Sequence, residues 1–313
     1  MNNRMKRASA EFQAMGTDVS VEIIDGGASA DGCLRNVEKI FSGNENIFSR
    51  FREDSELAML NRNLGKEVRV SDKMYEVLEL CVKFYGLSEG YFDPRVLANL
   101  EKIGYDKDFR ANDLNSKEDR QIGLEKINRD LQEDLVLPVG QPAGEKTVLI
   151  RRRIDTTGIA KGYSVDEAAR YLKKEGFKNF MVDAGGDMFA SGVDGKNESW
   201  QIGIEGMDDG DFVLKLDDEG IATSGISRKR WQIGGKKFHH LVNPKAPENF
   251  SFDIKTVTVI AEKTVEADGR AKVLVIMGRE EGLRFANENN IKALFLDYRG
   301  NVYLSKMIKE NIV

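Results

Sequence analysis

Three glycine-containing turns constrain the possible fold and function of this chain more than any other feature of its sequence. Residues 155–163 read DTTGIAKGY and lead from an expected strand into an expected helix. Ala184-Gly185-Gly186-Asp187 follows the next expected strand, and Ala222-Thr223-Ser224-Gly225 supplies hydroxyls and a flexible backbone. Glycine lets a backbone turn tightly and approach a ligand closely. Three such turns exceed what folding alone requires, so together they favour a binding site.

The segment 155–163 also has the parts of an anion site. A helix N-terminus offers free backbone N–H groups, and Lys161 adds a positive charge, so the segment is suited to a pyrophosphate. Glycine-rich turns before helices are also common without any ligand. Taken alone, the segment leaves a binding role and a purely structural role open.

Apolar periodicity predicts the fold class. Strand-like runs cover residues 19–23, 147–150, 180–183, 200–204, 256–260 and 293–296. Helical spacing covers residues 34–41, 74–81 behind Ser71 and Asp72, 165–172, and 267–277 before Gly278. This grouping predicts an α+β fold with largely antiparallel sheets and packed helices. We expect one domain over 1–313, with a charged surface excursion at 106–146 that holds at most one helix, near 121–131.

Charge and composition narrow the class of partner. The formal net charge of -5 and a pI near 5.4 argue against a nucleic-acid-binding protein, which needs surplus Lys and Arg. Cys33 and Cys81 are expected to pack as small apolar groups. No stretch has the length and apolarity of a signal or membrane span. The chain as it stands is expected to be cytoplasmic, or exported or membrane-anchored if a leader has been removed.

His239 and His240 are the only histidines of the chain. His240 precedes Leu241-Val242-Asn243-Pro244, a run that leaves a strand for a turn. A lone histidine is more often structural, but imidazole is suited to acid–base chemistry near neutral pH and other candidates are lacking. His240 is therefore the predicted catalytic base, with Asp268 as the alternative proton acceptor.

Glu266 and Asp268 lie in the first turn of the helix expected at 267–277. Acidic side chains there complement the helix dipole, which explains them without any ligand. An Asp in this place is also a hard oxygen ligand for Mg²⁺. Spacing along the sequence leaves both readings open.

Eight segments of the chain resemble, in order, those of the ApbE family of FAD:protein FMN transferases. They are Ala14-Met15-Gly16-Thr17, residues 48–52 with 54–57 and Asn61, residues 90–94, residues 155–163, residues 184–187, residues 222–225, residues 240–244, and Glu266-Ala267-Asp268. No single segment would suffice. The ordered set between about Met15 and Gly278 is specific.

The resemblance implies a two-lobed α+β fold with FAD in the cleft. It implies a Mg²⁺-dependent reaction in which a Thr or Ser hydroxyl of an acceptor protein attacks the FAD phosphate next to riboflavin and releases AMP. The acceptors are flavoproteins of redox systems, with a motif of Asp, Gly or Ala, any residue, Ser or Thr, Gly, Ala, and Ser or Thr.

The resemblance also implies roles for individual residues. Those expected to line the flavin or adenine pockets are Met15, Phe51, Tyr91, Phe92 and Asp93. Those expected to hold the ribityl and phosphate region are Thr157, Lys161, Ser224 and Gly225. His240 matches the active-site histidine and Val242 a neighbouring apolar contact. The Ala160 carbonyl and the Asp268 carboxylate match metal-ligand positions.

This chain departs from the family pattern at the metal position. The family reads Ala-Asp-Ala-Leu-Ala-Thr, with the Thr in the metal site, whereas this chain has Lys272 in place of that Thr. A protonated lysine has no lone pair for a metal. Lys272 either pairs with Asp268 or the FAD phosphates, with Arg270 nearby, or turns outward into solvent. Asn243 replaces the Asp that is usual in the family's His-Ile-Ile-Asp-Pro run. Ile226 and Ser227 replace the Asp or Asn and the Tyr that commonly follow Ser-Gly.

Three functions are compatible with these departures. The first is an active FMN transferase with an altered metal site. The second is a flavin-binding carrier or assembly partner that has lost transfer chemistry. The third is an FAD pyrophosphatase that passes FMN to water.

Overall fold

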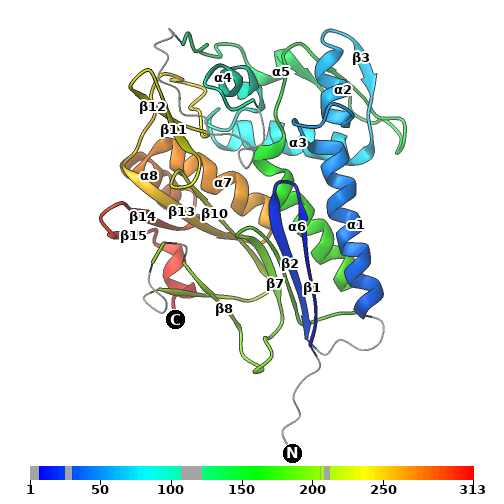
Figure 1. Cartoon of the computed structure of the whole chain (residues 1–313), viewed down its shortest axis with the longest axis vertical. Coiled ribbons are helices and arrows are strands. Elements are labelled where there is room, and N and C mark those ends of the chain that lie inside the picture. Colours follow the sequence, from blue (N-terminus) through cyan, green and yellow to red (C-terminus); the bar gives the residue numbers. More distant parts are fainter. Residues whose placement is uncertain (1–6, 25–29, 107–121, 205, 208–211) are drawn as a thin grey trace, which may run out of the picture.

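An eight-stranded sheet forms the larger lobe of the protein, and a helical lobe stands above it in Figure 1. The computed structural model describes residues 7–24, 30–106, 122–204, 206–207 and 212–313. The sheet runs in the order β1-β2-β6-β7-β10-β13-β14-β15, and each of these pairings is antiparallel. Its strands are β1 (Arg7–Ala14), β2 (Thr17–Ile24), β6 (Phe180–Ala184), β7 (Asp187–Ser191), β10 (Glu219–Gly225), β13 (Ile254–Ala261), β14 (Lys292–Asp297) and β15 (Val302–Leu304).

Smaller antiparallel sheets and the helices complete the two lobes. The small sheets pair β3 (Glu67–Arg69) and β4 (Leu135–Val136) with β5 (Thr147–Ile150), β8 (Trp200–Gly203) with β9 (Val213–Leu216), and β11 (Arg230–Ile233) with β12 (Lys236–His239). The helices are α1 (Ala30–Phe48), α2 (Glu56–Arg62), α3 (Asp72–Leu87), α4 (Leu97–Lys102), α5 (Leu131–Asp134), α6 (Thr157–Lys174), α7 (Thr264–Met277) and α8 (Arg279–Glu288). The predicted α+β class with antiparallel sheets is confirmed.

Local signals in the sequence account for the predicted elements. Val19, Val21 and Ile23 alternate with more exposed residues because β2 buries one face. The Ser71 hydroxyl caps α3 by accepting the Met74 N–H at 3.1 Å. Gly278 ends α7 with a φ of 77°, a conformation that favours glycine. The six strands and four helices predicted from apolar spacing are present in the structure, although α1 and α6 extend several residues beyond their predicted ranges.

Two expectations about segments need correction. Residues 222–225 do not form a turn; they are the end of strand β10. The helix expected near 121–131 is not present over residues 122–130. The short helix α5 begins only at Leu131, and residue 121 lies outside the described residues. Leu131 and Leu135 of this charged segment are buried, so part of it belongs to the core.

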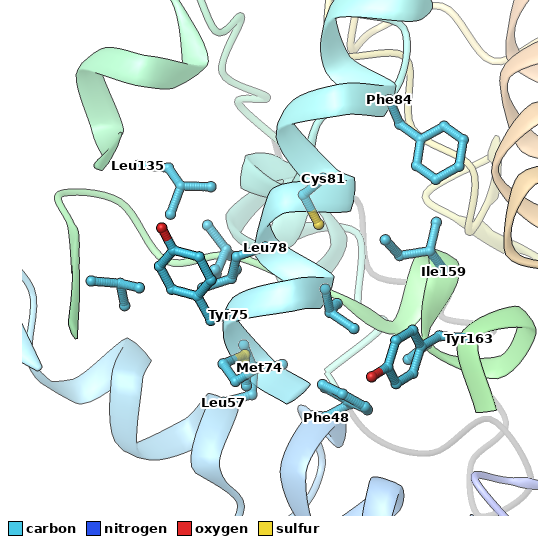
Figure 2. Close-up of a cluster of buried hydrophobic side chains, with 14 of the residues drawn as sticks. Phe48, Leu57, Met74, Tyr75, Leu78, Cys81, Phe84, Leu135, Ile159 and Tyr163 are labelled. Atoms are coloured by element: carbon cyan, nitrogen blue, oxygen red, sulfur yellow. The ribbon is translucent and has the colours of Figure 1, made fainter. Parts of the chain in front are cut away.

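Helix α6 joins the two lobes. Its first turns place Ile159, Ala160 and Tyr163 in the apolar core of the helical lobe, which Figure 2 shows packed around α3. Its later turns place Val165 and Leu172 against β2, β6 and α1 in the core of the larger lobe. The N-terminus of α6 is therefore fixed at the junction of the lobes. Among the helices of the described residues, none combines the length and apolar character that a membrane span requires.

Gly162 permits the close packing of α6 against α7. A Cβ at this position would lie 2.7 Å from the Val265 Cα and 2.8 Å from the Thr264 carbonyl oxygen, and both are backbone atoms that cannot move away alone. We expect Gly162→Ala to lower the free energy of unfolding by about 1–3 kcal/mol because of this overpacking. Urea denaturation measures the change.

Gly43→Ala is the matched control, because nothing lies within 4 Å of a Cβ at this position in α1. It should leave stability unchanged or raise it by up to about 1 kcal/mol, as expected for alanine in a helix. Equal stability of the Gly162 and Gly43 variants would contradict the close contact.

Candidate active site

A cavity of about 580 Å³ lies where the two lobes meet. Its walls come from the β1–β2 turn, the end of α1, the segment before α4, the first turns of α6, the end of β10, the segment after β12 and the later turns of α7. The residues predicted from sequence that line it are Met15, Phe51, Tyr91, Phe92, Asp93, Thr157, Ala160, Lys161, Ser224, Gly225, His240 and Val242. Asp268 does not line the cavity, because it is fully buried beneath it.

The β1–β2 turn brings Met15 to the cavity wall. Ala14 pairs with Thr17, so Met15 and Gly16 form a two-residue hairpin turn. Their φ angles are 53° and 72°, and positive values at both positions match a type I′ turn. This conformation is uncommon for a side chain such as methionine. The turn therefore fixes the position of Met15, a flexible apolar side chain, on the cavity wall.

One part of the cavity is aromatic. Phe51 and Tyr105 meet edge to face with their ring centroids 6.0 Å apart. The buried Arg50 guanidinium lies 4.2 Å from the Phe51 centroid and 4.5 Å from that of Tyr105. Its Nε lies 3.3 Å from the Asp155 carboxylate, which also accepts the Thr157 N–H at 2.8 Å. Arg50 thus ties the aromatic wall to the start of α6.

Another part of the cavity is strongly charged. Lys161 pairs with Asp187, and both line the cavity with Arg228, Lys229 and Lys272. Burial acts to lower the pKa of Lys161, but the Asp187 and Asp268 carboxylates outweigh it and raise that pKa. Burial and the Asp268 charge raise the pKa of Asp187 to about 6, against the lowering effect of both lysines. The Lys161 ammonium therefore remains charged beside the cavity, as a phosphate ligand requires.

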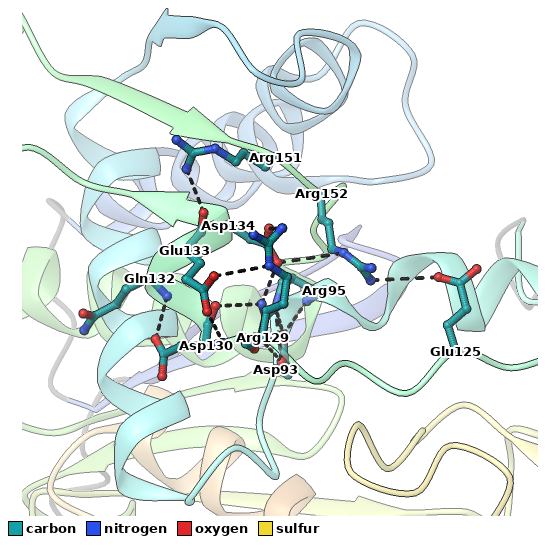
Figure 3. Close-up of polar contacts among 10 residues, drawn as sticks. All are labelled: Asp93, Arg95, Glu125, Arg129, Asp130, Gln132, Glu133, Asp134, Arg151 and Arg152. Atoms are coloured by element: carbon teal, nitrogen blue, oxygen red, sulfur yellow. Dashed lines mark hydrogen bonds and ion pairs between the residues drawn. The ribbon is translucent and has the colours of Figure 1, made fainter.

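Asp93 lines the cavity but is already engaged. Its carboxylate accepts two hydrogen bonds from the Arg95 guanidinium, from Nε at 3.0 Å and from Nη2 at 2.7 Å (Figure 3). It also accepts the Arg95 backbone N–H at 2.9 Å. These contacts support a role in fixing the Tyr91–Asp93 wall of the cavity.

The two histidines have different surroundings. The His239 ring is buried, with Nε2 3.0 Å from the Ser251 carbonyl oxygen, and its Nδ1 accepts the Leu241 N–H at 3.3 Å. Burial lowers the pKa of His239 to about 4, so this ring is a neutral structural group. His240 lines the cavity, and its Nδ1 has no hydrogen-bond partner among the described residues.

The environment of His240 keeps its imidazole neutral. Burial is the largest cause and the charge of Lys229 the next, and together they lower the pKa of His240 well below the ordinary value. A neutral imidazole has one nitrogen with a free lone pair, which can accept a proton. Of the two histidines, His240 alone is placed for chemistry in the cavity.

The comparison with known protein families agrees with this geometry. The model of the ApbE family matches residues 15–295 of the chain. This chain belongs to the ApbE family. The matched region includes each of the residues predicted for the site.

Curated relatives cover most of the chain. The FAD:protein FMN transferase of Haemophilus influenzae is 27% identical over 316 residues, which are 96% of this chain and 89% of that protein. The enzyme of the same name from Vibrio cholerae is 27% identical over 289 residues, 90% of this chain and 85% of that protein.

Solved structures of the ApbE family share the fold. The ApbE protein of Thermotoga maritima superposes with a TM-score of 0.82 at 22% identity, covering 98% of this chain and 99% of that one. The apo form of the Pseudomonas stutzeri flavinyl transferase ApbE gives a TM-score of 0.80 at 23% identity and covers 99% of each chain.

At the two metal-ligand positions that the family resemblance implies, the ligand atoms already have partners within the protein. The Ala160 carbonyl accepts the Ser164 hydroxyl at 2.8 Å. One Asp268 oxygen pairs with the Lys272 ammonium, and the other accepts the Gly162 N–H at 3.4 Å. No group of three or more His, Cys, Asp or Glu side chains in the described ranges is arranged to hold a metal. Of the two directions expected for Lys272, the structure has the one in which its ammonium pairs with Asp268.

Sequence reasoning missed several residues of the cavity. Tyr105 lies at the edge of the charged segment, and Arg228 and Lys229 follow the Ser-Gly pair of β10. The basic run from Arg228 to Arg230 was a signal for a phosphate ligand. Tyr105 gave none, because its contact with Phe51 joins distant parts of the chain. Arg270, expected near the phosphates, instead lies 3.6 Å from Glu266.

Proposed function

We propose that this protein is an FAD:protein FMN transferase, which moves FMN from FAD to a Thr or Ser hydroxyl of an acceptor flavoprotein and releases AMP. The observation that carries the proposal is the composition of the cavity between the two lobes. An aromatic wall suits an isoalloxazine or adenine ring, and lysines beside the α6 N-terminus suit a pyrophosphate. The relatives that match nearly the whole chain bear the name of this activity.

The proposed reaction forms one bond and breaks one. The acceptor oxygen bonds to the FAD phosphorus next to riboflavin, and the bond from that phosphorus to the bridging oxygen of the pyrophosphate breaks. AMP leaves with the bridging oxygen. The hydroxyl proton passes to the neutral imidazole of His240, which has an unpaired nitrogen. Lys161 and Lys272 offset the charge that develops on the phosphates.

Two alternatives share the same binding site. A carrier or assembly partner would bind FAD and leave it intact. An FAD pyrophosphatase would give AMP and free FMN. The neutral, cavity-lining ring of His240 favours a catalyst over a carrier, which has no use for such a base. The name that the relatives share favours transfer over hydrolysis.

We expect the protein to bind FAD at least about tenfold more tightly than FMN or riboflavin, because the cavity has contacts for both halves of the dinucleotide. Isothermal titration calorimetry with the three flavins measures the difference. AMP serves as the matched control for the adenylate half. Equal affinity for FAD and FMN would show that the adenylate half is not held, and the transferase proposal would lose its basis.

A further inference from the structure

Four charged side chains from two helices and strand β7 form a cluster at the cavity floor. Lys272 pairs with Asp268 one turn away on α7, and Lys161 on α6 pairs with Asp187. The Asp268 and Asp187 side chains are 0% and 2% exposed, whereas those of Lys272 and Lys161 are 17% and 28% exposed. The carboxylates therefore lie beneath the ammonium groups, and the ammonium groups face the cavity.

We propose that the Lys272 ammonium takes the place of a divalent cation at this site, so that the protein binds the FAD phosphates without a metal. This inference rests on the proposed function, since it assumes FAD as the ligand. It assigns the cation role to a residue of this chain.

The contacts of Asp268 leave no place for a metal ion. Lys272 covers one of its oxygens, and the Gly162 N–H approaches the other at 3.4 Å. A divalent ion would have to displace the ammonium from a fully buried carboxylate. The ion would also lie close to the ammonium groups of Lys272 and Lys161, and like charges repel. The Lys272–Asp268 pair therefore excludes the ion that a Thr at this position would help to hold.

Lys272 also lies where a phosphate would bind. A Cβ built at Gly158, in the first turn of α6, would lie 3.9 Å from the Lys272 Cδ. The lysine stem thus runs beside the α6 N-terminus, whose dipole and N–H groups attract anions. Gly158 and Lys272 both line the cavity. An anion held at this helix end meets the ammonium directly, so charge is supplied without an ion.

The test compares FAD affinity in EDTA and in Mg²⁺ by calorimetry on the whole chain. The parent protein should show the same Kd in both within about twofold. Lys272→Thr should bind FAD about 10- to 100-fold more weakly in EDTA, because it loses a charge-assisted contact, and should recover affinity in Mg²⁺. Lys272→Arg keeps the charge and should remain insensitive to EDTA. Arg270→Thr, on the same helix but outside the cavity wall, is the matched control and should behave like the parent.

A second readout does not depend on FAD. Mg²⁺ should raise the thermal midpoint of Lys272→Thr and leave that of the parent unchanged, because an ion stabilises only the folded state that binds it. Parent protein whose FAD affinity falls tenfold or more in EDTA would overturn the inference. So would a Lys272→Thr variant that matches the parent in both buffers. Absence of FAD binding in either buffer would instead refute the proposed function.

Discussion

Replacing His240 with Ala is expected to slow FMN transfer by roughly 10²- to 10⁴-fold, the usual contribution of a general base. The ring lines the cavity, its Nδ1 lacks a hydrogen-bond partner among the described residues, and its lowered pKa keeps it neutral at pH 7. Rates are measured by mass spectrometry of the acceptor under single-turnover conditions. FAD affinity should change much less than the rate, because the lost interaction belongs to the proton transfer.

His239→Ala is the matched control, since it removes the neighbouring imidazole. His239 holds the Ser251 carbonyl and the Leu241 N–H, so its loss should lower stability by about 1–3 kcal/mol. The transfer rate of the folded protein should change little. Equal slowing of transfer in both variants would show that the rate depends on the geometry at the end of β12, and that His240 is not the base.

The pH dependence gives a further test of His240. A base must be unprotonated to act, so transfer falls as pH drops through its pKa. Because the pKa of His240 lies well below its ordinary value, the acid limb of kcat/KM should fall below pH 6.5. This limb should be lost in His240→Ala. An unchanged limb in the variant would assign it to another group, such as Asp187.

Replacing Arg95 with Ala is expected to lower the free energy of unfolding by about 3–5 kcal/mol, because it leaves buried carboxylates uncompensated. The Arg95 side chain is 1% exposed, and those of Asp93 and Asp134 are each 2% exposed. Its Nη1 donates to Asp134 at 2.7 Å and to the Asp130 carbonyl at 3.0 Å (Figure 3). Urea denaturation measures the loss.

Arg152→Ala is the control for the Arg95 variant. Arg152 approaches the same Asp134 carboxylate only to 3.9 Å, and its side chain is 42% exposed. Removing such an exposed partner should cost less than about 1 kcal/mol. The triple variant with Asp93→Asn, Arg95→Met and Asp134→Asn should be more stable than Arg95→Ala. A loss below 1 kcal/mol in Arg95→Ala would mean that water reaches these carboxylates.

The elements that were predictable have local causes. The alternation in β2, the Ser71 cap of α3 and the Gly278 end of α7 depend on neighbours in sequence. Gly225 was wrongly predicted to lie in a turn, because the contact that requires a glycine there comes from a distant part of the chain. A Cβ there would lie 2.5 Å from the Lys255 carbonyl oxygen on the neighbouring strand β13. The sequence shows the glycine but not the backbone that approaches it.

In the candidate site, too, some residues were predictable from the sequence, whereas some contacts depend on the tertiary fold. Twelve residues selected by the family resemblance line the same cavity, because the segments that carry them meet between the two lobes. The direction of Lys272 was left open, since a long side chain can turn to solvent or inward. Its pairing with Asp268 joins residues one turn apart on α7, whereas α7 packs against α6 at Gly162 through contacts between distant parts of the chain. That approach is a property of the tertiary fold, as is the contact of Arg50 with Tyr105.

The mass of an acceptor protein tests the central claim most directly. An acceptor domain with the family motif is incubated with this protein and FAD, and the intact mass is then measured beside an acceptor whose motif hydroxyls are replaced by Ala. We expect the first acceptor to gain the mass of one FMN with release of AMP, and the second to stay unchanged. FAD that binds but is not consumed, or FMN that appears free in solution while the acceptor mass is unchanged, would contradict the proposed transfer.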